Sequence, residues 1–181
     1  SKGINVYGFD KSNNSIKEAL EKNIIDSKVE SILDINSKDF VKKVDLIIVA
    51  VPPKQTLDVL NDLKDIWNTD VTITDTSSVK NHIKLNGASN IILSHPIAGS
   101  DQSGISAANG DLFKNKKNVL CDPFNSKKGH FEKVDNFWKN ALQMRTSSMS
   151  VAEHDLIFAM TSHLPHLVSY ALIDSIRLSN H

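Results

Sequence analysis

The chain has 181 residues, of which 40% are hydrophobic and 23% are charged, a balance typical of a soluble globular protein with one α/β domain and a little more. Its 21 Lys and Arg residues match its 21 Asp and Glu residues, and the formal net charge of +0 indicates neither a nucleic-acid partner nor an anionic membrane surface. The single cysteine, Cys121, excludes an internal disulfide and favours a reducing, cytoplasmic location. The apolar run at residues 46–53 is too short to span a membrane, and we see no signal peptide.

Strand and helix patterns alternate along the first three quarters of the chain. A capping box, with Ser15 as N-cap and Glu18 three residues later, is expected to start the first helix. The β-branched run at residues 44–52 is typical of a strand that is covered on both faces. We expect strands at residues 4–10, 44–52, 71–75, 90–95 and 117–122, and helices at residues 15–24, 54–67 and 131–144. This alternation predicts right-handed crossovers and an α/β fold with a mostly parallel sheet and flanking helices.

The pattern changes in the last part of the chain. Residues 151–181 are apolar with helical spacing nearly to the end, so we expect one long helix, or two helices joined at Pro165. The chain therefore divides into an α/β domain at residues 1–149 and the first segment of a helical domain at residues 150–181.

Asp10 lies at the end of the first expected strand. In a dinucleotide-binding unit, an acidic residue at the end of the second strand bonds the ribose hydroxyls of adenosine. Its carboxylate would also repel a 2′-phosphate, which favours NAD over NADP. The alternative is that Asp10 only caps the following turn. Val51 and Pro52, with Pro53, would form a stiff turn beside the dinucleotide, although a simple X-Pro strand end explains them equally well.

The stretch TDTSSVK, residues 74–80, ends a strand and is expected to open a helix. Ser77 and Ser78 are natural N-caps, and we expect at least one of them to serve as a cap. A serine hydroxyl at the carboxyl end of a strand also faces the ligand crevice of an open α/β sheet. Such a hydroxyl could steady a nicotinamide ring or an imidazole.

His95 lies at the end of the next strand, within SHPIAGSDQSG at residues 94–104. A lone histidine is more often structural than catalytic. Three features favour catalysis here: the strand end, the rigid bond to Pro96, and the Gly99-Ser100 pair, which lets the backbone approach a ligand closely. A neutral imidazole near its ordinary pKa can take a proton from an alcohol at pH 7.

A third motif, HDLIFAMTSHLPH, occupies residues 154–166. At 100° per residue, Asp155, Ser162 and His166 fall within about 40° of one another on a helix. His163 lies to one side of this polar stripe. The stripe faces either a ligand or simply water. His163 and His166 could bind zinc, but without a matching cysteine or an HExxH pattern we expect no metal.

The segments TDTSSVK, SHPIAGSDQSG and HDLIFAMTSHLPH, in this order and spacing, resemble the prephenate/arogenate dehydrogenase family of tyrosine biosynthesis. The resemblance covers essentially the whole chain. It implies a Rossmann-like dinucleotide-binding domain that lacks its first strand and glycine loop, followed by the start of a helical dimerisation domain and hence a homodimer. It also implies NAD(P)-dependent oxidative decarboxylation of prephenate, a small molecule, to 4-hydroxyphenylpyruvate, with NAD favoured over NADP.

The resemblance also assigns roles to individual residues. The catalytic histidine of the family matches His95, which would bond the ring hydroxyl of the substrate and accept its proton. The family serine matches Ser78, which would orient His95 and the nicotinamide. His166 matches the histidine nearest the substrate, and the other positions that match the substrate site are Ser100, His154, Ser162 and His163.

Parts of the family pattern fall outside the sequence. Gly3 has the position of a residue that ends a helix, and no terminator closes the last helix before His181, so we expect an internal fragment of a longer protein. The glycine-rich phosphate loop would precede Ser1, and the arginine that binds the substrate carboxylate would follow His181. We therefore expect this chain alone to be inactive.

Three alternatives stay open. The sequence does not distinguish prephenate from arogenate, which has an amino group in place of the keto group. A dehydrogenase of the β-hydroxyacid group would share the serine-containing strand end, but would place a catalytic lysine where this chain has SHLPH. The third alternative is a non-catalytic domain that binds a metabolite or a partner and regulates.

Overall fold

The computed structural model describes residues 3–99 and 104–179. Its elements are, in chain order, β1 (Tyr7–Gly8), α1 (Asn13–Glu21), β2 (Ser27–Lys28), α2 (Ile32–Ile35), α3 (Lys38–Val41), β3 (Leu46–Val49), α4 (Pro53–Asp62), η1 (Lys64–Ile66), β4 (Thr72–Asp75), β5 (Ile91–Ile97), η2 (Ile105–Ala107), β6 (Lys117–Cys121), α5 (Lys128–Asn136), η3 (Phe137–Ala141), β7 (Arg145–Ser148), α6 (Val151–Phe158), η4 (Ala159–His163) and α7 (Leu164–Ser179). The elements η1 and η2 are 3₁₀ turns, whereas η3 and η4 are π-helical turns.

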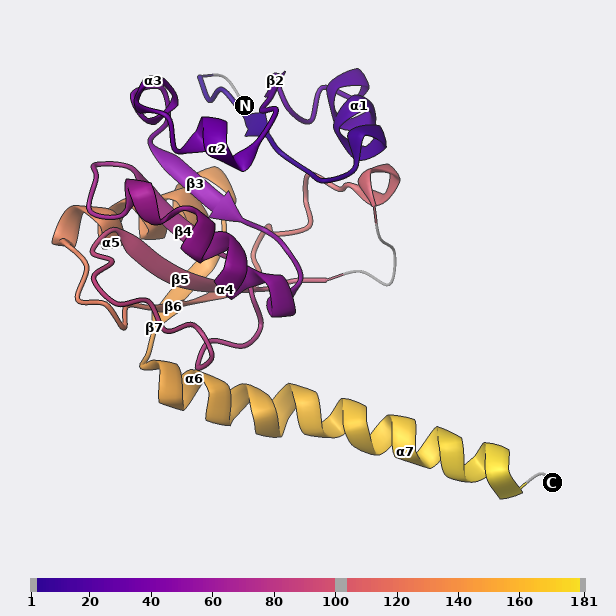
Figure 1. The fold of residues 1–181 in the computed structure, drawn as a ribbon. Helices are drawn as coiled ribbons and strands as arrows, with labels where there is room; N and C mark the ends of the chain where they lie inside the picture. Colours follow the sequence, from indigo (N-terminus) through magenta and orange to yellow (C-terminus); the bar gives the residue numbers. More distant parts are fainter. Residues whose placement is uncertain (1–2, 100–103, 180–181) are drawn as a thin grey trace.

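The strands form two sheets (Figure 1). β1 and β2 make a short parallel pair, and the other five strands lie in the order β3-β4-β5-β6-β7. All neighbours in the larger sheet are parallel except β5 and β6, so the expectation of a mostly parallel sheet is confirmed. The described part of the β5–β6 connection holds only the turn η2 and not the helix that usually links parallel neighbours.

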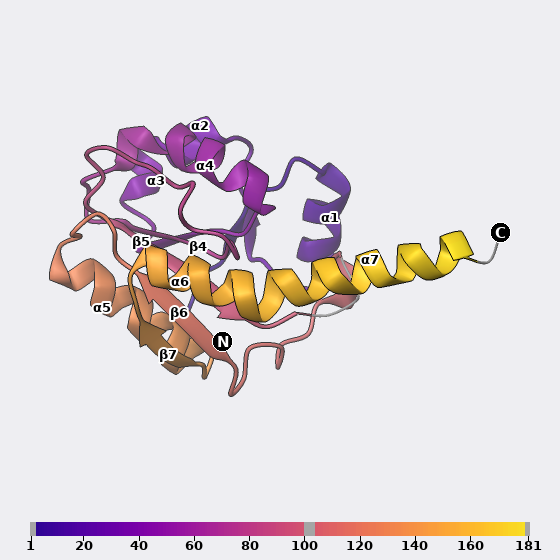
Figure 2. The same ribbon diagram turned by 90° about the horizontal axis from the view of Figure 1, so that it is seen from below.

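Helices cover both faces of the larger sheet, with α4 on one side and α5 on the other (Figures 1 and 2). β5 runs through the middle and divides its side chains between two hydrophobic clusters. Ile91 and Leu93 join the cluster that contains Leu60 of α4, and Ile92 joins the cluster that contains Trp138 of η3. Because side chains alternate along a strand, Ser94 continues the Trp138 side and His95 continues the α4 side.

Two expectations for the beginning of the chain are wrong. The strand predicted at residues 4–10 is reduced to Tyr7–Gly8, because β1 pairs only with the two residues of β2. The first helix is capped by Ser12, whose Oγ accepts the Ser15 N–H at 3.3 Å, so Ser15 lies inside the helix. Glu18 takes no part in a capping box; it accepts a hydrogen bond from Ser106 at 2.6 Å instead.

The last three elements form one continuous helix, Val151–Ser179, which extends beyond the sheet domain (Figure 2). Ser150 and Glu153 form a true capping box at its start. The helix passes through Pro165 without a break, and the π-helical turn η4 ends two residues before this proline. Wider turns of this kind accommodate the loss of the backbone hydrogen bond that a proline removes. Of the two forms expected for this segment, the single long helix is the one observed.

Most of this helix exposes apolar side chains. Leu156, Met160, Leu167 and Leu178 are 63%, 64%, 65% and 77% exposed. By length and composition alone the helix could cross a membrane, but a helix that packs inside a soluble protein meets the same two criteria.

Candidate active site

The parallel strands β3, β4 and β5 bring their carboxyl ends to one edge of the sheet. Val51 follows β3, Asp75 ends β4, and His95 lies near the end of β5. Open α/β sheets bind their ligands at this edge, because the loops that leave the strands there line a common crevice. The strand register therefore places two of the three sequence motifs beside each other.

Asp75 is fully buried and ties the end of β4 to β5. Its two carboxylate oxygens accept hydrogen bonds from the Ser94 N–H at 3.0 Å and the Ser77 N–H at 2.9 Å. Lys80 returns from the following loop, and its Nζ lies 2.6 Å from the Asp75 carboxylate and 2.5 Å from the Ser94 carbonyl oxygen. These contacts fix the backbone immediately before His95.

The helix expected after β4 does not form. The backbone N–H groups of Lys80 and Asn81 donate to the Asp155 carboxylate of α6 instead of to carbonyl groups of such a helix. Ser77 closes a local turn instead: its Oγ donates to the Val79 carbonyl at 3.0 Å and accepts the Val79 N–H at 3.4 Å. Ser78 is half-buried, and its side chain makes no hydrogen bond within residues 3–99 and 104–179.

His95 is held by the long helix. Its Nδ1 lies 2.9 Å from Nε2 of His154, and Nδ1 of His154 lies 2.7 Å from Oδ1 of Asp155. The Asp155 carboxylate also accepts the backbone N–H groups of Lys80 at 3.0 Å and Asn81 at 2.8 Å. A continuous series of hydrogen bonds therefore joins the end of β5 to α6 and to the loop after β4.

The two imidazoles are shielded from water. His154 is completely buried, and His95 is partly buried. The ring of Phe158, one turn further along α6, lies 4.6 Å from the His95 ring and 4.7 Å from the His154 ring, measured between centroids. The aromatic side chain makes the surroundings of both histidines apolar, which disfavours their charged forms.

Burial is the main reason that the pKa of His95 falls to about 3. Neighbouring groups act in both directions: the shift is deepened by His154, Lys80 and His163 and opposed by Asp155. Burial also lowers the pKa of His154, against the pull of Asp155. The expectation of an ordinary pKa for His95 is therefore wrong. Its imidazole is neutral at pH 7, which is the form a proton acceptor needs.

Asp155 remains ionised in this environment. Burial opposes its charge, but the hydrogen bonds from His154 and from the backbone of Asn81 and Lys80 outweigh that effect and lower its pKa. The series thus runs from an ionised carboxylate through two neutral imidazoles. Sequence reasoning placed Asp155 on a polar stripe and assigned that stripe to the same site as His95, but it did not identify the bonds that join the two residues through His154.

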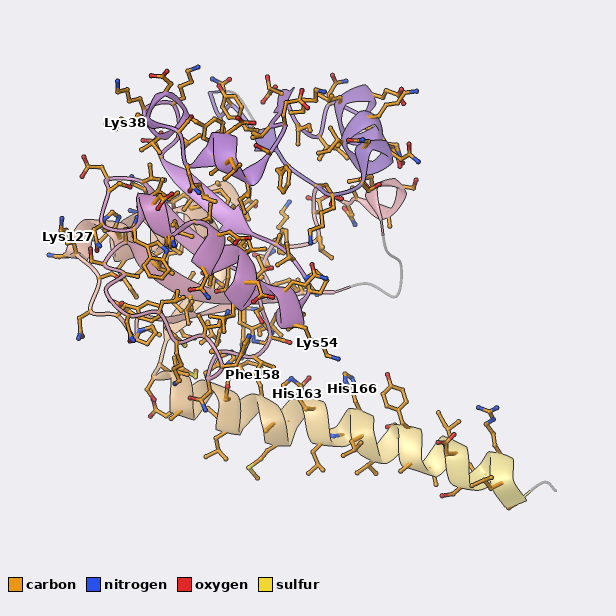
Figure 3. All side chains as sticks on the ribbon, in the orientation of Figure 1. Lys38, Lys54, Lys127, Phe158, His163 and His166 are labelled. Atoms are coloured by element: carbon orange, nitrogen blue, oxygen red, sulfur yellow. The ribbon has the colours of Figure 1, made fainter. Side chains whose placement is uncertain are left out.

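The remaining polar residues of the third motif lie further along the helix. Ser162 is half-buried, whereas His163 and His166 are exposed. Figure 3 shows Phe158, His163 and His166 on the side of the helix that faces the sheet domain. The sequence prediction that His163 lies to one side of the stripe assumed 100° per residue throughout. The π-helical turn η4 has a wider turn and changes that angle for the residues after it. Ser100 lies outside the described residues.

The residues expected to bind a cofactor lie on two loops. Asp10 is exposed after β1, and its Oδ1 accepts the Ser12 N–H at 2.7 Å, so it does cap the turn. Val51 packs against the core cluster after β3, and the exposed Pro52 precedes α4 as its N-cap. An exposed carboxylate can bind ribose hydroxyls, and a stiff turn keeps its backbone in place; both properties suit a dinucleotide site.

Metal binding finds no support in the described part of the chain. Within residues 3–99 and 104–179, no group of three or more His, Cys, Asp or Glu side chains is arranged to hold a metal ion.

Comparison with known families gives two matches that together span nearly the whole chain. The prephenate dehydrogenase nucleotide-binding domain matches residues 1–143, and the prephenate dehydrogenase dimerization domain matches residues 150–181.

Individual relatives agree with these matches. Prephenate dehydrogenase from Bacillus subtilis is 30% identical, over 94% of this chain and 46% of its own length. Cyclohexadienyl dehydrogenase from Zymomonas mobilis is 29% identical, over 94% of this chain and 58% of its own length. The crystal structure of prephenate dehydrogenase from A. aeolicus with hydroxyphenyl propionate and NAD+ superimposes with a TM-score of 0.83, at 29% identity, over 97% of this chain and 61% of that one. The chain thus spans about half the length of the curated relatives it matches.

Proposed function

Because this chain belongs to the prephenate dehydrogenase family, we propose that the protein containing it oxidatively decarboxylates prephenate to 4-hydroxyphenylpyruvate with NAD+, as a step of tyrosine biosynthesis. The observation that carries the proposal is the state of His95: a neutral imidazole at the ligand-binding edge of the sheet, with Nδ1 already engaged by His154. One ring nitrogen, Nε2, is thereby left for a substrate.

His95 acts on the ring hydroxyl of prephenate. Its Nε2 accepts a hydrogen bond from that hydroxyl and takes the proton as the carbon–oxygen bond gains double-bond character. NAD+, when bound, accepts the hydride from the carbon that bears the hydroxyl. The ring carboxylate then leaves as carbon dioxide, the ring becomes aromatic, and the proton on His95 returns to the oxygen. The overall reaction therefore releases no net proton.

The low pKa of His95 sets a condition on this step. A weak base takes a proton only if its cation is stabilised in the site. Asp155 supplies that stabilisation, because its negative charge acts on His95 through His154. Aromatisation of the ring makes the whole reaction favourable, so the proton needs to stay on His95 only briefly.

The cofactor side follows from the two loops described above. Asp10 would bind the ribose hydroxyls of adenosine and disfavour a 2′-phosphate, so NAD is preferred over NADP. Val51 and Pro52 would line the dinucleotide after β3. Ser78, at the same edge, would contact the nicotinamide.

The substrate side is formed by the helix and the loop after β5. His166, His163 and Ser162 lie on the helix that carries His154, and prephenate has two carboxylates that attract polar and positive groups. Ser100, in the loop after β5, belongs to the same proposed group.

The exposed apolar side chains of the long helix fit a homodimer. A surface of this length and composition is stable in water only when it is covered, and the dimerization-domain match at residues 150–181 points to a second copy of the protein as the cover. A cytoplasmic location agrees with this assignment, since the buried Cys121 is a free thiol.

Arogenate is a second candidate substrate. It shares the cyclohexadienol ring of prephenate, and one curated relative is named for a cyclohexadienyl substrate. Steady-state kinetics of the full-length protein test both proposals. Each substrate is offered with NAD+ and with NADP+, and formation of the reduced nicotinamide is followed. We expect turnover of prephenate with NAD+; the absence of turnover with either substrate and either cofactor would refute the proposed function.

A further inference from the structure

The hydrogen bonds among Asp155, His154 and His95 determine which nitrogen of each ring carries a hydrogen. An ionised carboxylate only accepts, so the hydrogen of the 2.7 Å bond belongs to Nδ1 of His154. A neutral imidazole carries one hydrogen, so Nε2 of His154 is an acceptor. In the 2.9 Å bond to His95, the donor must then be Nδ1 of His95.

We propose that Asp155 and His154 are positioning residues that hold His95 as its Nδ1–H tautomer, so that the unprotonated Nε2 faces the substrate as the base. The role of Nε2 as a catalytic base rests on the proposed function, but the tautomer of His95 does not depend on any substrate. It also moves His154 from the substrate-contacting role that the family resemblance implies to a place behind His95. Its ring is fully buried, and both of its nitrogens are bonded to protein groups.

The carboxylate is itself fixed by groups that cannot change roles. The backbone N–H groups of Lys80 and Asn81 donate to Asp155, and a backbone amide has no second tautomer. The neighbouring capping box of Ser150 and Glu153 fixes the start of the same helix. Oδ2 accepts the Asn81 N–H at 2.8 Å and the Lys80 N–H at 3.3 Å, whereas Oδ1, which faces His154, also lies 3.0 Å from the Lys80 nitrogen. The backbone thus sets the orientation of the carboxylate, and the two imidazoles adjust to it.

The variant Asp155→Asn tests whether the group at position 155 determines the tautomers of His154 and His95. Its amide keeps one acceptor oxygen, which we expect at the position of Oδ2, where it accepts the Asn81 N–H at 2.8 Å and the Lys80 N–H at 3.3 Å, because these groups cannot reverse. The amide NH₂ then faces His154 and donates to Nδ1, which transfers the His154 hydrogen to Nε2. That nitrogen now donates to Nδ1 of His95, and His95 changes to the Nε2–H tautomer, with its hydrogen where the base should be.

The direct measurement is long-range ¹H–¹⁵N NMR of the histidine rings near pH 7.5 in the full-length protein, labelled with ¹⁵N only in its histidines. The signals of His95 are identified by their loss in His95→Gln. We expect the Nδ1–H pattern in the parent chain, the Nε2–H pattern in Asp155→Asn, and no change in the control Asp122→Asn. Asp122 also accepts a backbone N–H, that of Ser126 at 3.1 Å, but no histidine is bonded to it. An Nε2–H pattern in the parent chain, or an unchanged pattern in Asp155→Asn, would overturn the inference.

Kinetics of the full-length protein supply the second readout. Asp155→Asn should lower kcat by about 10²-fold or more with KM nearly unchanged, because a base in the wrong tautomer affects the proton transfer and not binding. His154→Gln should lose less, since its amide oxygen can still accept the His95 Nδ1–H. If the protein proves inactive on both substrates, the proposed function is refuted, while the NMR measurement still tests the tautomer of His95 independently. If it is active and Asp155→Asn retains full kcat, the positioning role is refuted.

Discussion

Lys80 and Asp75 form an ion pair that is completely buried at the end of β4, with Nζ 2.6 Å from the carboxylate. Burial lowers the pKa of Lys80, and the charge and hydrogen bond of Asp75 counteract that shift. The same ammonium group bonds the carbonyl of Ser94, the residue before His95. The pair therefore holds the backbone that carries the proposed base.

Replacing Lys80 with methionine should destabilise the fold strongly. The change keeps the volume but leaves the Asp75 carboxylate buried with only two backbone donors, Ser77 and Ser94. An uncompensated buried charge of this kind costs about 3–5 kcal/mol, and the two remaining donors place the expected loss near the lower end. Urea denaturation of the parent chain and of Lys80→Met measures the difference in the free energy of unfolding.

Two further variants control this prediction. Lys80→Met combined with Asp75→Asn should recover part of the loss, because it removes the unpaired charge. Lys28→Met breaks the exposed pair of Lys28 and Glu30, which are 2.7 Å apart, and should cost less than about 1 kcal/mol. Equal losses in Lys80→Met and Lys28→Met would contradict the buried-pair account.

Much of the larger sheet could be predicted because its strands carry strong local patterns. The β-branched run at β3 and the apolar runs at β4, β5 and β6 gave strands within a few residues of their observed bounds. The elements β2, α2, α3 and β7 were not predicted, because each is only two or four residues long and, unlike the equally short β3 and β4, none lies within a longer apolar or β-branched run. Segments this short have no clear period, and tertiary contacts decide their structure. The position of the first N-cap was missed because Ser12 and Ser15 are equally suitable as residue types.

The site could be predicted in part for the same reason. His95 was singled out by its place at a strand end, which sequence periodicity locates well. The bond from His95 to His154 spans 59 residues, and nothing in the spacing of the motifs indicates which two histidines meet. Both residues of the buried Asp75–Lys80 pair belong to the motif TDTSSVK, but the expected helix there gave no reason to pair them. The signal that could have revealed the pair was the presence of two opposite charges in a segment whose other residues are apolar or carry hydroxyl groups.

The proposed base is tested by His95→Asn in the full-length protein. The amide cannot accept a proton at neutral pH, so kcat should fall by at least about 10²-fold. The affinity for NAD should stay near that of the parent protein, because His95 is not among the residues expected to hold the dinucleotide. Steady-state kinetics and fluorescence titration with NADH measure the two quantities. Nearly full turnover in the variant would remove His95 from the chemistry.

Cofactor preference is tested by Asp10→Ala. Loss of a charged hydrogen-bond acceptor for the ribose should weaken NAD binding by about tenfold or more, whereas NADP binding should stay unchanged or improve as the repulsion disappears. The control is Asp34→Ala, since Asp34 is also exposed but interacts with Ser31 at the start of α2. Titration of each variant of the full-length protein with both cofactors gives the ratio of affinities. An unchanged ratio in Asp10→Ala would contradict the ribose assignment.

The stability of the chain should fall as the pH is lowered from 7 to 5. The pKa of His95 is about 3 in the folded chain, whereas an unfolded histidine titrates near 6.5, so the unfolded state binds more protons in this range. His95 alone should then remove about 1–2 kcal/mol from the free energy of unfolding between pH 7 and pH 5. His154, whose pKa is also lowered, adds a loss in the same direction. Asp155 affects stability only at lower pH, because its pKa lies below the ordinary range of an aspartate and its carboxylate stays ionised between pH 7 and pH 5.

Urea denaturation at pH 7, 6 and 5, in the parent chain and in His95→Gln, isolates the contribution of His95: the variant should lose less stability over this interval. An equal loss in both proteins would show that His95 is free to take up a proton in the folded state, and its neutral form at the sheet edge could then not be attributed to burial.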